Sequence, residues 1–177
     1  MMFLKFRDTF ILIILTIIVA LLWRIDTSMS RFEKKLESVE GTVSFQMYES
    51  IEKWSDSFNI PKHIAYNVAY KETRYKGPFD FNYEHKLESS AGAVGPLQVI
   101  TKWAQQYSRR RISERELKTN VDLNVKIGMQ MLRKWHNIYN DWTLACGAYN
   151  SGRPIRNEYA IYCVNNKDYK NKWVDLE

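Results

Sequence analysis

An apolar helical face ends in a carboxylate at residues 61–72, which read PKHIAYNVAYKE. Pro61 suits the first position of a helix, where its missing N–H is not needed. The apolar positions of the expected inner face are Ile64, Ala65, Val68 and Ala69. Glu72 follows Val68 by four residues and Ala69 by three. This helical period predicts that the Glu72 side chain lies on the face that the helix buries.

A carboxylate directed toward a core is costly unless it is paired, hydrogen-bonded or protonated. Loss of water disfavours the ionised form, so the pKa rises toward the range in which a carboxylic acid serves as a general acid. Glu72 is therefore a candidate catalytic acid. A structural interpretation stays open, in which Glu72 bends out to solvent at the helix end or pairs with Arg74.

The rest of the body also carries helical patterns, without a long alternating strand pattern. Pro96 is expected to open a helix. Along one side of that helix lie Val99, Ile100, Trp103 and Tyr107. Asn120 or Asp122 can cap another helix. Its apolar positions are Val121, Val125, Gly128, Leu132, Trp135 and Tyr139. A further helix runs from about Trp142 to Asn150 and stops at Gly152, a usual end signal. These patterns predict an all-α fold, in which the tryptophans at helical spacing serve packing.

The N-terminal segment, residues 1–27, is predicted to be a membrane anchor. Phe10–Trp23 reads FILIILTIIVALLW and has basic Lys5 and Arg7 before it and Arg24 after it. At ~1.5 Å per residue the run covers about 21 Å, against a bilayer core of ~30 Å, so flanking residues must extend the span. A cleaved signal peptide is the second interpretation. The run lacks a polar face, which argues against a buried core helix.

Two further parts are predicted, a helical stalk over residues 28–53 and a single-core body over residues 54–177. Apolar residues of the stalk follow a spacing of four and three. One stripe consists of Phe32, Leu36, Val39 and Val43, and the next of Met47, Ile51, Trp54 and Phe58. Stripes this short do not establish a coiled coil, so the oligomeric state stays open.

The charge balance allows an anionic partner, since 26 Lys and Arg stand against 20 Asp and Glu. The basic run Arg109–Arg111 is followed by Glu114 and Glu116, and no nucleic-acid-binding module surrounds it. We therefore expect a solvated face and no nucleic-acid partner.

Neither histidines nor cysteines form a metal-binding pattern, and no metal is expected. The histidines, at positions 63, 85 and 136, lack ligand spacing. Cys146 and Cys163 are too few for a disulfide framework. They could pair with each other in an oxidising compartment or remain two buried thiols.

Three ordered motifs include the candidate acid. Residues 72–73 read ET, residues 89–98 read SSAGAVGPLQ and residues 148–152 read AYNSG. In this order, after a proline-initiated helix, they resemble the soluble lytic transglycosylase family, peptidoglycan-cleaving relatives of goose-type lysozyme. The resemblance covers about Trp54 to Gly152. It implies a lysozyme-like, mainly α-helical domain that works without a cofactor.

The chain departs from the family pattern at two places. The family's Gly-Leu-Met-Gln is Gly-Pro-Leu-Gln at residues 95–98, which leaves the apolar residue of the groove undecided. The span from Glu72 to Ser89 is longer than in the family, and an insert around residues 79–85 is expected to reshape the groove. Neither departure removes the acid.

The resemblance implies cleavage of the β-1,4 bond between N-acetylmuramic acid and N-acetylglucosamine, with Glu72 as single acid and base and a 1,6-anhydromuramic product. It implies substrate contacts at Ser89, Gln98, Tyr149 and Asn150, and a looser match at Tyr159. For Ser89 and Gln98 the alternatives are a turn-capping hydroxyl and an exposed helix position. For Tyr149 and Asn150 they are core packing and a helix terminus.

The expected setting is a single-pass, membrane-anchored enzyme whose body lies in the periplasm or outside the cytoplasm, next to peptidoglycan glycan strands. Wall remodelling, an envelope secretion apparatus and a bacteriophage particle with a viral membrane are all compatible with it, as are protein partners in such assemblies. Two other functions stay open, a hydrolytic goose-type muramidase and a catalytically silent wall-binding protein.

Overall fold

The structure, a computed structural model, describes residues 2–173 and the side chains of residues 11–171 and 173. Met1, residues 174–177 and the side chains of the predicted flanking charges Lys5 and Arg7 lie outside the described part. The described chain is mainly helical, with one short hairpin, and the predicted all-α class is confirmed.

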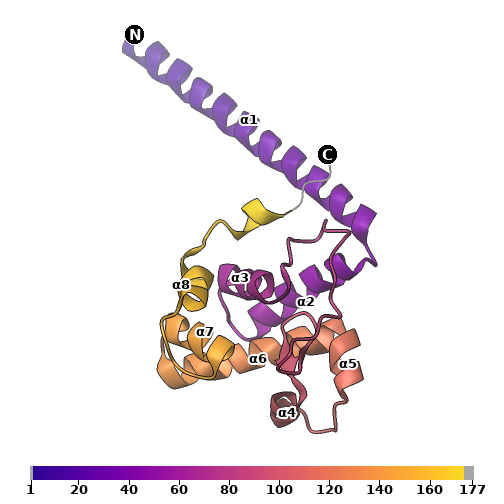
Figure 1. Cartoon of the computed structure of the whole chain (residues 1–177). Coiled ribbons are helices and arrows are strands. Elements are labelled where there is room, and N and C mark those ends of the chain that lie inside the picture. Colours follow the sequence, from indigo (N-terminus) through magenta and orange to yellow (C-terminus); the bar gives the residue numbers. More distant parts are fainter. Residues whose placement is uncertain (1, 174–177) are drawn as a thin grey trace. The chain divides into compact units, whose positions relative to one another are not determined.

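The elements follow one another along the chain (Figure 1). The α-helices are α1 (Met2–Val39), α2 (Val43–Ser57), α3 (Lys62–Thr73), α4 (Thr101–Ala104), α5 (Glu114–Thr119), α6 (Val121–Tyr139), α7 (Trp142–Ser151) and α8 (Glu158–Asn165). Two 3-10 helices, η1 (Gln105–Tyr107) and η2 (Tyr169–Lys172), and two strands, β1 (Ala93–Val94) and β2 (Val99–Ile100), complete the fold.

The chain divides into two compact units, Met1–Ser38 and Val39–Glu177. Helix α1 makes up the described part of the first unit. Among the described helices it alone is long and apolar enough to cross a bilayer, and its side chains from 11 to 25 are exposed. Met47 and Ile51 of α2, which belong to the predicted stalk, are fully buried in the second unit.

The helices of the second unit form a closed circuit of contacts. Helix α6 packs against α2 and α7, α7 packs against α8, α8 packs against α3, and α3 packs against α2. All six side chains from Ile64 to Ala69 of α3 are buried. The four residues of the predicted inner face are buried, as expected, but the buried surface of α3 also includes Tyr66 and Asn67. A helix that is buried around most of its circumference belongs to the core of the domain.

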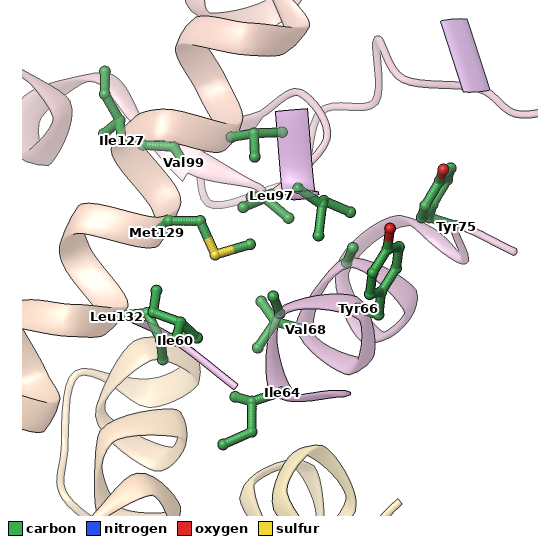
Figure 2. Close-up of a cluster of buried hydrophobic side chains, with 14 of the residues drawn as sticks. Ile60, Ile64, Tyr66, Val68, Tyr75, Leu97, Val99, Ile127, Met129 and Leu132 are labelled. Carbon is green, nitrogen blue, oxygen red and sulfur yellow. The ribbon is translucent and has the colours of Figure 1, made fainter. Parts of the chain in front are cut away.

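The core forms where α3 meets α6 and the hairpin. Figure 2 shows Ile64 and Val68 of α3 on the side that faces Met129 and Leu132 of α6, with Leu97 close by. Leu97, Met129 and Leu132 are at most 1% exposed. This packing fixes the hairpin relative to the end of α3 that bears Glu72.

The expectation that Pro96 opens a helix is wrong. Strands β1 and β2 pair antiparallel, and the chain between them turns through residues 95–98 with a 3.0 Å hydrogen bond from Gln98 N to the Gly95 carbonyl oxygen. Pro96 occupies the second position of this turn, where its fixed φ is equally suitable. The next helix, α4, begins only at Thr101.

The predicted start of α6 and the predicted end of α7 agree with the structure. Asn120 caps α6, because its side chain accepts a hydrogen bond from Leu123 N at 2.9 Å. Asp122 instead accepts one from Trp54 Nε1 at 2.8 Å. Helix α7 ends at Gly152, which has a left-handed φ of 71°.

Close packing of α7 depends on a glycine in its interior. A methyl group at Gly147 would lie 1.9 Å from the carbonyl oxygen of Ile155, in the segment that leads to α8. Alanine favours a helix interior by about 1 kcal/mol over glycine. At this position, however, the backbone of the neighbouring segment would have to move.

We expect Gly147→Ala to lower the free energy of unfolding by about 1–3 kcal/mol, the usual cost of overpacking. Urea denaturation of the full chain in detergent micelles measures this. Gly41→Ala is a control, since a methyl group there has no atom within 4 Å and only the positive φ of 83° opposes it. A Gly147→Ala variant as stable as the wild type would contradict the close approach.

Candidate active site

Glu72 lies in the last turn of α3, and its carboxylate is directed to α8. Its Oε1 atom accepts a hydrogen bond of 2.5 Å from the hydroxyl of Tyr159. Tyr159 belongs to α8 and is 8% exposed. Glu72 therefore neither bends out to solvent nor has an ion pair with Arg74 in the described structure.

Burial dominates the electrostatics of Glu72. Loss of water raises the pKa of its carboxyl to about 7, although the Tyr159 hydrogen bond and the Lys71 charge both lower it. A carboxylic acid with this pKa holds a proton near neutral pH and can also release it, as a general acid and base must.

A buried amide network fixes α8 against α3. The side-chain nitrogen of Asn67 donates to the carbonyl oxygens of Cys163, at 3.0 Å, and Asn166, at 2.7 Å. The Asn166 side chain donates back to Asn67 Oδ1 at 2.7 Å. These bonds align the two helices whose side chains meet at Glu72 and Tyr159.

The end of α3 is also tied to the hairpin turn. The Thr73 hydroxyl donates to the Pro96 carbonyl oxygen at 2.9 Å and lies 2.8 Å from the hydroxyl of Tyr83. Tyr83 comes from the predicted insert, residues 79–85. The insert thus contacts the residue next to Glu72.

Asn124 of α6 holds the turn from the other side. Its amide nitrogen donates to the carbonyl oxygens of Val94, at 2.8 Å, and Leu117, at 3.0 Å, and its Oδ1 atom accepts from Leu97 N at 2.9 Å. Gly95 is required beside it, because a β-carbon there would lie 2.4 Å from Asn124 Nδ2. Sequence reasoning missed Asn124, although a carboxamide on the apolar face of a helix could have indicated it.

Gln98 ends the turn with a φ of 49°, in the left-handed region that non-glycine residues seldom adopt. Its side-chain nitrogen donates to the carbonyl oxygens of Gly95, at 3.0 Å, and Leu87, at 3.3 Å. The residue lies in the turn before β2 and not on the exposed helix face that sequence reasoning considered.

Tyr149 and Asn150 come from the end of α7. The Tyr149 hydroxyl donates to the Leu97 carbonyl oxygen at 2.7 Å, so α7 is bonded to the hairpin turn. Burial and then the nearby Glu72 charge raise the pKa of Tyr149 well above its usual value. Asn150 is exposed, and its Oδ1 atom accepts from Asn157 at 3.0 Å.

Ser89 forms a turn of its own. Its hydroxyl oxygen accepts from Ala93 N at 3.1 Å, which matches the turn-capping interpretation. Within the described chain, no hydrogen bond joins Ser89 to Glu72 or to the other predicted contacts.

A cavity of about 540 Å³ brings three of the predicted contacts together. Its wall includes Gln98 from the hairpin and Tyr149 and Asn150 from α7. Trp103 of α4 and Trp135 of α6 also line it. Tyr149 lines this cavity, and the nearby Glu72 charge raises the pKa of its hydroxyl, but Glu72 itself is not among the residues that line the cavity.

The remaining predicted groups lie elsewhere. Cys146 and Cys163 are buried free thiols on α7 and α8. Among the described residues, no group of three or more His, Cys, Asp and Glu side chains could hold a metal ion. In the basic run, Arg110 is exposed and forms a salt bridge with Glu116, as expected for a solvated face.

Comparisons with known proteins identify the family and the fold of the chain. The family described as Transglycosylase SLT domain matches residues 49–172. The fold is similar to the X-ray structure of an inactive mutant of the lytic transglycosylase Slt from Pseudomonas aeruginosa, with a TM-score of 0.51 and 17% sequence identity over 70% of this chain. The match spans 21% of that enzyme's length. No curated protein matches the sequence.

The raised pKa of Glu72 predicts how the stability of the fold depends on pH. Below about pH 4.5, the ordinary pKa of a glutamate, Glu72 is neutral whether the chain is folded or not. Between this pH and about 7 only the unfolded chain ionises, so the folded state loses stability as the pH rises. Above about pH 7 the loss is complete and constant.

We expect Glu72→Gln to have a free energy of unfolding that is higher than that of the wild type by roughly 2–3 kcal/mol at pH 8. Near pH 4 we expect no difference between the two chains. Urea denaturation of both chains at the two pH values measures this. A gain of equal size at pH 4 would show that ionisation of Glu72 is not its cause.

Proposed function

Because the chain belongs to the Transglycosylase SLT domain family, we propose that it is a peptidoglycan lytic transglycosylase. The substrate is the glycan strand of peptidoglycan, and the bond is the β-1,4 link between N-acetylmuramic acid and N-acetylglucosamine. The observation that carries this proposal is Glu72, a carboxyl with a pKa raised by burial to about 7, which accepts a hydrogen bond from the Tyr159 hydroxyl.

In the proposed first step, Glu72 donates its proton to the glycosidic oxygen, and the bond from C1 of the muramic acid residue to that oxygen breaks. The 2-acetamido oxygen of the muramic acid residue stabilises the cationic centre at C1. The N-acetylglucosamine product leaves with the proton as a new hydroxyl. The Tyr159 hydrogen bond then stabilises the carboxylate that Glu72 has become.

In the second step, the Glu72 carboxylate takes the proton of the muramic C6 hydroxyl, and that oxygen bonds to C1. The product is a 1,6-anhydromuramic end, and Glu72 is protonated again. The internal nucleophile is already held near C1, which removes the entropic cost of capturing water. One carboxyl group is therefore sufficient.

The contacts with substrate are proposed to come from Gln98, Tyr149 and Asn150, which line the cavity. Ser89 is proposed as a further contact through its hydroxyl proton, since the oxygen already accepts from Ala93 N. No step requires a cofactor.

We further propose that α1 anchors the protein in a membrane, with the second unit outside the cytoplasm. The support is the length and apolar composition of α1, whose exposed side chains would be in contact with lipid. Peptidoglycan lies outside the cytoplasmic membrane, so an anchor would keep the enzyme next to its insoluble substrate.

Glu72→Gln is expected to reduce the release of soluble fragments from purified sacculi by about a hundredfold to ten-thousandfold, because the amide N–H is far too weak an acid to protonate the leaving oxygen. The full chain in detergent is compared with the variant at equal concentration, and circular dichroism establishes that both are folded. Equal rates for the two chains would refute the enzymatic proposal and favour a silent wall-binding protein.

Mass spectrometry of the fragments separates the two enzymatic outcomes. A transglycosylase leaves anhydro ends, which are lighter by one water than the reducing ends left by a hydrolase. We expect anhydro ends. Reducing ends alone would assign the chain a goose-type muramidase activity with the same acid.

Extraction of membranes with alkaline carbonate tests the anchor. An integral chain stays in the pellet, because transfer of about 15 apolar side chains from lipid to water is strongly unfavourable. The intact chain is expected in the pellet. Its recovery in the supernatant, or a mature chain that lacks the apolar run, would contradict the anchor and favour a signal peptide.

A further inference from the structure

The two cysteines of the chain meet in the core of the second unit. Cys146 belongs to α7 and Cys163 to α8, two helices that pack against each other. Both side chains are fully buried thiols, and a hydrogen bond joins them. The proposed reaction uses neither thiol, so their meeting is a separate feature of the fold.

The two helices carry small side chains where they are buried. On α8, Ala160 is fully buried beside Tyr159 and Cys163. Gly147 of α7 lies so close to the backbone of Ile155, in the segment leading to α8, that a methyl group does not fit. The buried residues of α7 are Ala145, Cys146, Gly147 and Ala148. A disulfide needs two α-carbons within about 7 Å of each other, and small neighbours permit this approach.

Burial makes the pair unreactive once the helices have packed. The hydrogen bond with Cys146, loss of water and the Glu72 charge raise the pKa of the Cys163 thiol, although the Lys71 charge lowers it. Only the thiolate attacks a disulfide, so a buried thiol with a raised pKa reacts slowly. An oxidant must therefore reach the pair before α7 and α8 close on each other. The same burial then protects the bond from reductants.

Each cysteine lies one helical turn from a tyrosine of the candidate site. Tyr149 follows Cys146 by three residues on α7, and Cys163 follows Tyr159 by four on α8. Residues at these spacings are neighbours on one side of a helix. The Tyr149 hydroxyl bonds to the hairpin turn, and the Tyr159 hydroxyl bonds to Glu72. A covalent bond between the cysteines would therefore lie within one turn of both contacts.

We propose that Cys146 and Cys163 form a disulfide when the chain folds in an oxidising compartment, and that this bond holds α8, with Tyr159, against α7. The bond goes beyond the proposed function, because it requires only an oxidant. Its value for the position of Glu72 rests on that function.

The oxidant is itself a disulfide, that of a protein thiol oxidase or of glutathione. The thiolate of one cysteine attacks it, which forms a mixed disulfide and releases one thiol. The thiolate of the other cysteine then attacks the mixed disulfide, so that the bond within the chain forms and a second thiol leaves. The two cysteines lose two electrons and two protons, and the oxidant gains both.

Thiol labelling of the full chain tests the pairing. The reduced chain is unfolded in urea and refolded in detergent with glutathione and glutathione disulfide, then denatured and treated with a maleimide attached to polyethylene glycol. We expect no label without reductant and two labels after reduction, because the chain has two cysteines. Cys146→Ala and Cys163→Ala are the controls, and each should take one label after reduction. The chain isolated from bacterial membranes, with its thiols trapped by acid, should behave as the refolded wild type does.

Thermal unfolding measures what the bond contributes. Wild type refolded with glutathione disulfide is compared with wild type refolded with dithiothreitol, both in the same detergent. We expect the oxidised chain to melt higher by roughly 5–10 °C, because the bond closes the loop between residues 146 and 163 in the unfolded state. The double variant Cys146→Ala/Cys163→Ala passes through the same two treatments and should melt at one temperature.

Hydrogen exchange locates the effect. Amides of α8 should exchange at least ten times more slowly in the oxidised wild type than in the reduced one. Those of α5, which packs against α6 and β1, should change less.

The proposal is overturned if the refolded wild type takes two labels without reductant. A bond that forms but changes neither the melting temperature nor the exchange of α8 would overturn its role in holding that helix. Cleavage of sacculi is measured separately with the wild type. A disulfide that stabilises α8 in a chain without cleavage would support this inference and reject the proposed enzyme activity.

Discussion

The Glu72 carboxylate lies at the end of a helix that is buried around most of its circumference, so it loses most of its contact with water. This desolvation is the constraint on which the rest of the site depends. Within the described residues, the hydroxyl of Tyr159 donates a hydrogen bond of 2.5 Å to it. One short hydrogen bond does not replace bulk hydration, so the pKa stays raised, at about 7. Stability and proposed chemistry therefore share an origin, since the environment that makes the charge costly is the one that keeps the proton available.

Three hydrogen bonds converge on the turn of the hairpin, residues 95–98, from different helices. Thr73 bonds to it from α3, Asn124 from α6 and Tyr149 from α7. The same turn is thus bonded both to the helix that bears the candidate acid and to the helices that form the cavity wall. A small shift of any of these helices would displace the turn, because the close-packed backbone there has little freedom to adjust.

Much of this arrangement could be predicted from local patterns. The helical period located Glu72 on the buried face, and Asn120 and Gly152 marked helix ends, because each depends on neighbours within four residues. Pro96 misled, since the same φ suits a helix start and a turn, and the pairing of the two short strands on either side of residues 95–98 decided between them. The partners of Asn124 lie up to 30 residues away. Neither they nor the exposure of Trp103 on a helix of four residues follow from spacing.

Two requirements conflict at Gln98: its left-handed backbone favours glycine, whereas the hydrogen bond across the turn needs a long side chain. A side chain with a β-carbon costs about 1 kcal/mol there, so selection for stability alone would favour glycine. The glutamine side chain crosses the turn and bonds to the Leu87 carbonyl oxygen, which glycine cannot do. Replacement of Gln98 by glycine would therefore relax the backbone of the turn and, at the same time, release the loop at Leu87.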